Sequence, residues 1–101
     1  MFRAWAFTEM PYPYLPPEDS FESVRVTLPS RLYDPETGYQ LYRKYLDIYA
    51  AADELGLEIM LNEHHATATC VEPAVPLTMA ILARETRRAR LLALGNPIAN
   101  R

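Results

Sequence analysis

We predict an α/β fold because short apolar runs alternate with two segments of helical periodicity along the 101-residue chain. The expected order is strand, helix, strand, helix, strand. Right-handed crossovers then make the strands parallel and place the helices outside the sheet. The clearest predicted strand is residues 57–61, which follow Gly56 and are apolar at four of the five positions.

The first strand is expected at residues 2–7, where apolar and aromatic side chains alternate with small or polar ones until Pro11 stops the run. A long loop follows this strand. It begins with a stiff, proline-rich stretch over residues 10–17. Within residues 20–31, Val24, Val26 and Leu28 alternate with polar residues, which suggests a short extended segment or hairpin arm.

The first helix is expected to begin at Asp34, an N-capping residue followed by Pro35. Its apolar and aromatic side chains have the spacing of one buried helical face and comprise Tyr42, Tyr45, Leu46, Tyr49, Ala52 and Leu55. Gly56 ends the helix. We interpret the tyrosines as core packing, not as a surface for stacking a cofactor.

The second helix is expected over residues 77–88, because the two prolines of residues 73–76 suit the entry to a helix. Residues 91–94 then predict a third strand, closed by Gly95-Asn96-Pro97. Three parallel strands with two helices leave sheet edges and one sheet face uncovered. A complete (β/α)8 TIM-type barrel takes roughly 250 residues, so this chain would supply about three strands of eight, with a long loop after the first.

Composition favours one small unit without a membrane span, since half of the residues are apolar and no long run lacks charge. No targeting segment is visible, so a cytoplasmic location is expected. The single cysteine, Cys70, allows no internal disulfide, and we expect it in a loop or half-buried. The basic cluster of residues 84–90 is interpreted as a solvated helix face, because the net charge is −3 and no aromatic residues interleave it. Nucleic acid is therefore not an expected partner.

Glu63, His64 and His65 directly follow the central predicted strand. In parallel sheets the carboxyl ends of strands border the site where ligands bind, so we take these residues as the candidate site. From the residues alone, three interpretations stay open: hydrogen bonds to loop carbonyls, acid–base catalysis, or a metal site. A metal hydrolase that uses Glu63, His64 and His65 is the weakest of them, because no third spaced ligand is evident and nothing singles out another Asp or Glu as a metal ligand.

The strand end Asn62-Glu63-His64-His65, followed by a helix over residues 73–90 and a strand over 91–96, resembles the bacterial luciferase-like flavin-dependent monooxygenases. Met10-Pro11-Tyr12, the insertion through residues 32–35 and residues 40–42 look like one branch of that family, the luciferase-like oxidoreductases. The resemblance spans nearly all of residues 1–101 but covers only the amino-terminal part of the family's domain.

The resemblance implies a TIM-type barrel that holds reduced FMN, or a deazaflavin in some branches, and uses molecular oxygen on an organic small molecule. His64 matches the catalytic histidine beside the flavin, where an imidazole can gain or lose a proton near neutral pH. Glu63 and His65 are implied as its neighbours at the cofactor, with Glu63 fixing a histidine tautomer or a backbone amide. Asn96 and Pro97 match the strand end that runs under the flavin ring.

Members of the family commonly form pairs of barrels, so the resemblance implies an oligomer. If this chain is one segment of a longer protein, its partner is the remainder of the barrel. The alternative is a non-catalytic remnant or assembly module that needs a partner to complete the sheet.

Overall fold

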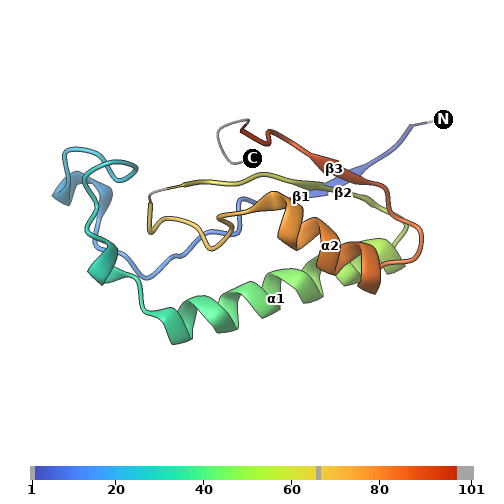
Figure 1. The fold of residues 1–101 in the computed structure, drawn as a ribbon, viewed down its shortest axis with the longest axis horizontal. Coiled ribbons are helices and arrows are strands. Elements are labelled where there is room, and N and C mark those ends of the chain that lie inside the picture. The colour runs from blue at the N-terminus through green and yellow to red at the C-terminus, as the bar shows by residue number, and fades with distance from the viewer. Residues whose placement is uncertain (1, 66, 98–101) are drawn as a thin grey trace.

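The computed structural model describes residues 2–65 and 67–97 and contains a parallel three-stranded sheet with two helices on one side (Figure 1). The α/β prediction is confirmed, in the predicted order of elements. In chain order the elements are β1 (Trp5–Phe7), the 3-10 turns Glu18–Ser20 and Ser30–Leu32, α1 (Pro35–Glu54), β2 (Glu58–Leu61), α2 (Val75–Glu85) and β3 (Leu91–Ala93).

The strands lie in the order β1-β2-β3, which is also their order in the sequence. Both neighbouring pairs are parallel, and Ile59 of β2 is aligned with Ala6 on one side and Leu91 on the other. Beyond the last paired residues, the Leu94 N–H still donates to the Leu61 carbonyl at 2.6 Å. All three strands therefore end at one edge of the sheet.

Helix α1 begins where the sequence predicts. Asp34 is the N-cap, and its side chain accepts a hydrogen bond from the Thr37 N–H at 2.8 Å, with Pro35 in the first turn. Tyr49 and Ala52 of the predicted apolar face are buried. Leu55 is not, since it is 79% exposed. The helix ends at Glu54, so Leu55 lies at the C-cap and turns away before Gly56, whose φ of 78° requires the freedom of glycine.

The core lies between the sheet and both helices. Its fully buried side chains include Tyr49 of α1, Ile59 and Leu61 of β2, and Leu82 of α2. The Tyr49 hydroxyl donates to the Thr8 and Met60 carbonyls, each at 3.2 Å, which ties α1 to the ends of β1 and β2. Because one cluster contains side chains from both helices and the central strand, α1 and α2 cover the same face of the sheet.

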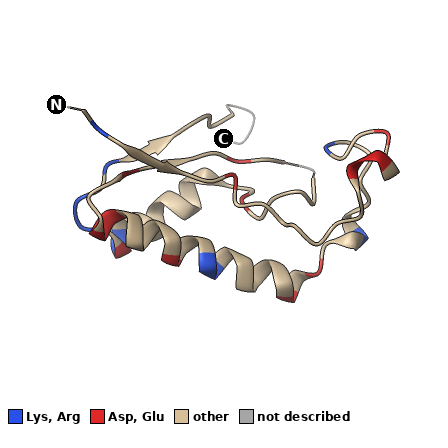
Figure 2. Cartoon of the chain, turned by 180° about the vertical axis from the view of Figure 1, so that it is seen from behind, with Lys and Arg blue, Asp and Glu red and all other residues tan. Residues whose placement is uncertain are grey.

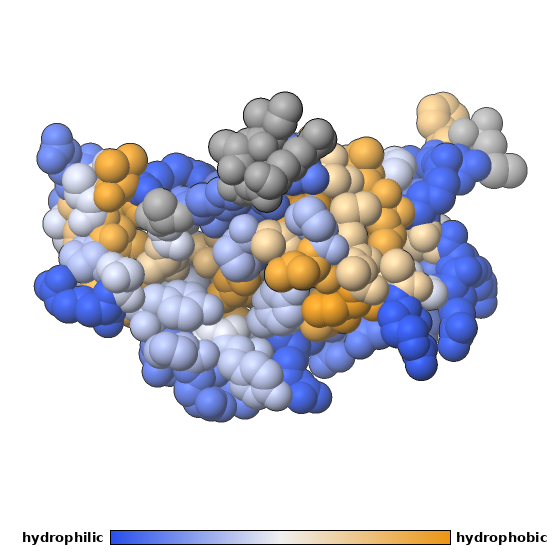
Figure 3. All heavy atoms as spheres, in the orientation of Figure 1, coloured by the Kyte–Doolittle hydropathy of each residue, from blue (hydrophilic) through white to orange (hydrophobic). Residues whose placement is uncertain are grey.

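The opposite face carries no helix among the described residues. Phe7, Met60 and Leu92 form a row across the three strands, and Phe7 and Leu92 are 45% and 40% exposed. The predicted uncovered face is therefore present, and this row of it is apolar. Figure 3 shows further apolar residues gathered over the region of α2 and β3.

The second helix is shorter than predicted. It begins at Val75, two residues before the predicted start, and ends at Glu85, three residues before the predicted end. The basic cluster is accordingly not one helix face, because residues 87–90 form the connection to β3. The prediction was wrong because an acceptor outside the helix binds this backbone: Asp53 of α1, 5% exposed, accepts from the N–H groups of Arg87, Arg88 and Ala89 at 2.6–2.9 Å.

We expect the Asp53 carboxylate to make stability depend on acid pH. The backbone N–H of Arg87, joined by those of Ala89 and Arg88, holds its pKa below the ordinary value, despite the opposing effect of burial. Since the folded-state pKa is the lower one, this stabilisation is present above about pH 4 and disappears as the pH falls through the folded-state pKa. Asp53→Asn should lower the melting temperature at pH 7 by several degrees and flatten its fall toward pH 3. An identical acid profile in the variant would contradict this role.

The loop between β1 and α1 contains no strand among its described residues. Where residues 20–31 predicted an extended segment, the chain forms turns between the two 3-10 segments. Leu28 is buried but Val26 is 80% exposed, so the alternating pattern does not mark one buried face.

Charged residues of both signs lie along α1, and acidic residues mark the first 3-10 segment (Figure 2). Among the described residues, neither helix has the combination of length and apolarity that crossing a membrane requires.

Candidate functional site

Glu63 follows the end of β2, and each of its two carboxylate oxygens has a partner. Its Oε2 accepts a hydrogen bond from the Val75 N–H at 2.7 Å, at the start of α2, and its Oε1 lies 2.7 Å from His65 Nε2. The Glu63 side chain is only 2% exposed, whereas that of His65 is 37% exposed. Glu63 therefore binds both a backbone amide and a histidine, the two roles considered for it from the sequence.

Glu72 is a second carboxylate at the same helix terminus, and the sequence analysis did not identify it. It is 1% exposed, and its side chain accepts from the Ala74 N–H at 2.9 Å and from the Thr78 hydroxyl. Burial raises the pKa of Glu72, and the nearby Glu63 adds to this effect against the two hydrogen bonds. Two carboxylates thus satisfy the free N–H groups at the positive end of the α2 dipole.

His64 is held through its backbone, not through its ring. Its N–H donates to the Glu72 carbonyl at 3.0 Å. The ring atom Nδ1 is buried and has no hydrogen-bond partner among the described residues. A buried imidazole nitrogen without a partner is unfavourable, and such groups are rare in folded proteins. His64 therefore differs from its neighbours Glu63 and His65, which are bonded to each other.

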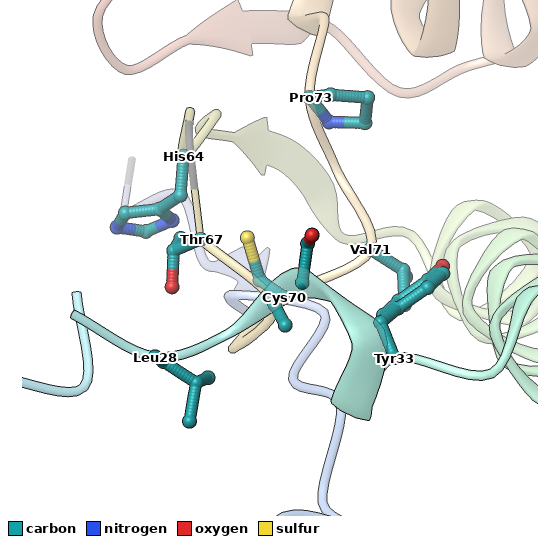
Figure 4. Close-up of a pocket in the computed structure, with 9 residues that line it drawn as sticks. Leu28, Tyr33, His64, Thr67, Cys70, Val71 and Pro73 are labelled. Atoms are coloured by element: carbon teal, nitrogen blue, oxygen red, sulfur yellow. The ribbon is translucent and has the colours of Figure 1, made fainter. Parts of the chain in front are cut away.

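His64 lies between two adjoining cavities that share Leu28, His64 and Cys70 as lining residues. We call the first, of about 450 Å³, the Leu28–Tyr33 cavity; Figure 4 shows His64, Thr67 and Cys70 to one side of it and Tyr33 to the other. Its apolar lining comprises Leu28, Tyr33, Ala68, Val71 and Pro73, and its polar lining comprises Ser30, His64, Thr67 and Cys70.

We call the second the proline-loop cavity. It has a volume of about 480 Å³ and lies against the proline-rich stretch of residues 11–17. It also includes the charged residues Glu9, Glu18 and Arg25. The proline-rich loop, which the sequence predicts to be stiff, therefore forms part of the surroundings of His64.

Backbone hydrogen bonds join the loop after β1 to the loop after β2 next to these cavities. Pro11 and Cys70 form an antiparallel bridge, with the Tyr12 N–H donating to the Thr69 carbonyl at 2.8 Å and the Val71 N–H to the Met10 carbonyl at 2.9 Å. Met10 has a φ of 50°, a left-handed conformation that non-glycine residues seldom adopt. The strained backbone thus lies where the β1 loop meets the β2 loop, and such strain often occurs near functional sites.

The Tyr33 wall of the Leu28–Tyr33 cavity is positioned by packing. Its ring centroid lies 4.7 Å from that of Tyr12, whose hydroxyl accepts from the Asp34 N–H at 3.1 Å. Against the ring lies Gly38 of α1, where an added Cβ would stand 1.8 Å from the Tyr33 Oη. Burial raises the pKa of Tyr33, followed in effect by Tyr12, so the phenol stays neutral at physiological pH.

Gly38→Ala is expected to displace Tyr33 while changing stability little. Alanine gains about 0.8–1.0 kcal/mol in helix propensity over glycine, and loss of the Tyr12–Tyr33 ring contact costs about 0.5–1.5 kcal/mol. The free energy of unfolding should therefore change by less than about 1 kcal/mol. The Val71 methyl signals, from the same cavity wall, should shift in NMR spectra. Unchanged Val71 signals would show that the absence of a side chain at Gly38 does not determine the position of the Tyr33 ring.

Cys70 is buried in its loop, deeper than the half-buried position allowed for it, and its thiol is free. Its Sγ donates weakly to the Glu72 carbonyl at 4.0 Å. Burial raises its pKa, with further contributions from Glu72 and Glu9. The thiolate is therefore disfavoured, and Cys70 acts as a neutral lining group, not as a nucleophile.

Asn96 and Pro97 follow β3 on an exposed segment, after Gly95 with its φ of 90°. Neither residue lines the two cavities around His64. The structure thus gathers Glu63, His64 and His65 at one strand end, whereas Asn96 and Pro97 follow the neighbouring strand at the same edge of the sheet and stay outside the lining of both cavities. Their assignment to a cofactor remains a prediction from the resemblance.

No protein-family model, curated protein or solved structure matches this chain. The chemistry of the site therefore rests on its own geometry. It offers one imidazole whose buried Nδ1 has no hydrogen-bond partner among the described residues, and this ring borders a cavity without charged side chains. The backbone of His64 is held by the Glu72 carbonyl, and the carboxylates of Glu63 and Glu72 bind the start of α2 nearby. Within residues 2–65 and 67–97, no group of three His, Cys, Asp or Glu side chains is placed to hold a metal ion.

Sequence reasoning missed Glu72, Leu28 and Tyr33 as parts of this site. Glu72 is the one acid in a small, polar loop directly before Pro73, a pattern typical of residues that cap a following helix. Leu28 and Tyr33 had no such signal, because tertiary folding alone brings their loop against the end of β2.

Proposed function

We propose that this chain forms the amino-terminal part of a flavin-dependent monooxygenase of the luciferase-like family, with His64 as its acid–base residue. The observation that carries the proposal is the position of His64: it follows the carboxyl end of the central parallel strand, its Nδ1 is buried without a partner among the described residues, and it borders two cavities.

The topology supports the barrel part of this proposal. Strands that follow one another in sequential order, with both helices on one face, form the repeating unit of a (β/α)8 barrel. A doubly wound sheet would instead place helices on both faces. In a barrel the apolar row of Phe7, Met60 and Leu92 would face the interior, where side chains from the remaining strands would cover it.

The residues present fit a flavin at this edge. His64 has a buried ring nitrogen whose partner is not among the described residues, and the loops around it are held by backbone bridges. We infer that His64 contacts the flavin ring system, with Asn96 and Pro97 contributed from the end of β3. The phosphate would bind to later strands. Reduced FMN would supply the electrons and activate oxygen, whereas a reduced deazaflavin would supply a hydride in place of this oxygen chemistry.

This chain's own residues would hold and move one proton. The His64 imidazole can donate or accept it, and Glu72 fixes the His64 backbone so that the ring stays at the strand end. Glu63 orients His65 and anchors the start of α2, so both histidines are attached to a rigid helix terminus. The neutral lining and buried thiol keep charged side chains away from the Leu28–Tyr33 cavity.

Binding of reduced FMN to the intact protein that carries this sequence tests the proposal. We expect saturable anaerobic binding, a rate of oxidation in air for the bound reduced FMN that differs from that of free reduced FMN, and shifts of the His64 ring signals in NMR spectra of ¹⁵N-histidine-labelled protein. In a second sample labelled at its leucine methyl groups, the signals of Leu55, which is exposed at the end of α1, serve as a remote control. If the intact protein binds no reduced flavin but its uncovered sheet face is buried against another chain, the alternative role as an assembly module would replace this one.

A further inference from the structure

The two cavities beside His64 differ in charge. No charged side chain is present among the described residues that line the Leu28–Tyr33 cavity, whereas the proline-loop cavity contains Glu9, Glu18 and Arg25. At about 450 Å³ the neutral cavity is within the size range of small-molecule sites. It is also the one walled by the Tyr33 ring, which Gly38 and Tyr12 hold in place.

Few polar groups of the neutral cavity are available to a ligand. The Thr67 hydroxyl already donates to the Val24 carbonyl at 3.2 Å and contacts the Thr69 hydroxyl at 3.0 Å. The Cys70 thiol contacts the Glu72 carbonyl. Ser30 lies exposed at the rim, and His64 stands at the border with the second cavity. A ligand in this cavity would therefore meet an apolar wall and polar atoms mainly at Ser30 and His64.

We propose that the Leu28–Tyr33 cavity binds the organic substrate, and that this substrate is an uncharged, mainly apolar molecule with one hydrogen-bonding group directed to His64. Calling the ligand a substrate rests on the proposed function, whereas its chemical class rests on the cavity alone. Carboxylates, sulfonates and phosphates are disfavoured as substrates, because the described lining contains no lysine or arginine to replace the hydration that an anion would lose on entering the cavity.

The electrostatics around Cys70 agree with this preference. The thiol lines the cavity, and burial is the largest influence that raises its pKa. The charges of Glu72 and Glu9 add to this rise, whereas the hydrogen bond to the Glu72 backbone and the charge of Arg25 oppose it. The same factors that disfavour a thiolate there would disfavour a bound anion.

Binding of two probes of matched size tests the proposal: neutral cyclohexylmethanol and the anion cyclohexanecarboxylate. In the intact protein, the methyl signals of Leu28, Ala68 and Val71 report on the cavity, and those of Leu77 and Leu94, exposed elsewhere, serve as controls. We expect the alcohol to shift the cavity signals and saturate, and the carboxylate to bind at least about tenfold more weakly. Equal or tighter binding of the carboxylate, or equal shifts at the control methyls, would overturn the proposal.

Substitution of the exposed Ser30 tests the reason for the preference without disturbing the core. Ser30→Lys adds a cation to the rim and should raise the ratio of carboxylate affinity to alcohol affinity several-fold. Ser30→Gln, the uncharged control, removes the same hydroxyl without adding charge, so it should leave this ratio unchanged. If Ser30→Lys leaves the ratio of the two affinities unchanged, with unaltered methyl spectra of the free protein, the carboxylate is not rejected for lack of a cation and the proposal fails.

These titrations contain no flavin and require no turnover, so they are independent of the proposed reaction. Preferential binding of the alcohol in a protein that binds no reduced FMN would support the ligand class and refute the flavin function. Turnover of anionic substrates alone, in a protein that binds reduced FMN, would support the flavin function and refute the ligand class.

Discussion

Replacing His64 by alanine in the intact protein is expected to lower flavin- and oxygen-dependent turnover by about 10²–10⁴-fold, the usual contribution of a positioned acid–base group. The fold should survive, because the described structure holds His64 through its backbone N–H and gives its ring Nδ1 no hydrogen bond. Stopped-flow absorbance with anaerobically reduced flavin, mixed with oxygen and substrate, measures the effect. Circular dichroism on the same sample checks the fold.

Two further variants separate chemistry from packing. His64→Gln keeps a polar side chain of similar reach but cannot transfer a proton in the same way, so it should bind reduced flavin and still turn over poorly. Tyr39→Ala removes an exposed aromatic ring on α1 that contacts Arg43, and should leave turnover unchanged. Wild-type turnover in His64→Ala would eliminate the acid–base role.

Glu63→Ala is expected to lower the free energy of unfolding by about 1.5–3 kcal/mol, the range for hydrogen bonds to charged groups. The reason is local: the Glu63 carboxylate is 2% exposed, accepts from the Val75 N–H and lies against His65. Its removal leaves an N–H at the start of α2 without that acceptor. Urea denaturation measures the loss.

Glu54→Ala is the matched control, because Glu54 is an exposed glutamate at the end of α1. Its substitution should change the free energy of unfolding by no more than about 0.5 kcal/mol. Glu63→Gln should lie between the two, since the amide keeps one acceptor oxygen but loses the charge. Equal effects of Glu63→Ala and Glu54→Ala would show that Glu63 does not anchor the helix.

The sequence was sufficient for those parts of the fold that local chemistry determines. Asp34 and Pro35 mark the start of α1, and the apolar run after Gly56 marks β2, because capping and periodicity act within a few residues. The three-residue Glu63–His65 cluster was recognised because it directly follows that run. The resemblance implied a histidine or a backbone amide as the partner of Glu63, and the structure contains a contact of each kind. That the amide belongs to the start of a helix was not predicted.

The remaining features depend on contacts between residues far apart in the chain. Asp53 binds the backbone of residues 87–89, which ends α2 early and takes the basic cluster out of the helix, and no local pattern indicates this partner. Leu28 was read as part of an alternating segment, yet it lines a cavity beside His64. Tyr33 depends on the space that Gly38 leaves open one helical turn into α1.

The size of the endogenous protein tests most directly whether this sheet belongs to a flavin-binding barrel. Peptides of the protein isolated from its source cells, mapped by mass spectrometry together with its intact mass, give the length of the chain that carries Glu63 and His64. The account predicts a chain of roughly 250 residues or more, the length that eight strand–helix units require. An intact chain of 101 residues that remains monomeric and unfolds cooperatively would contradict it.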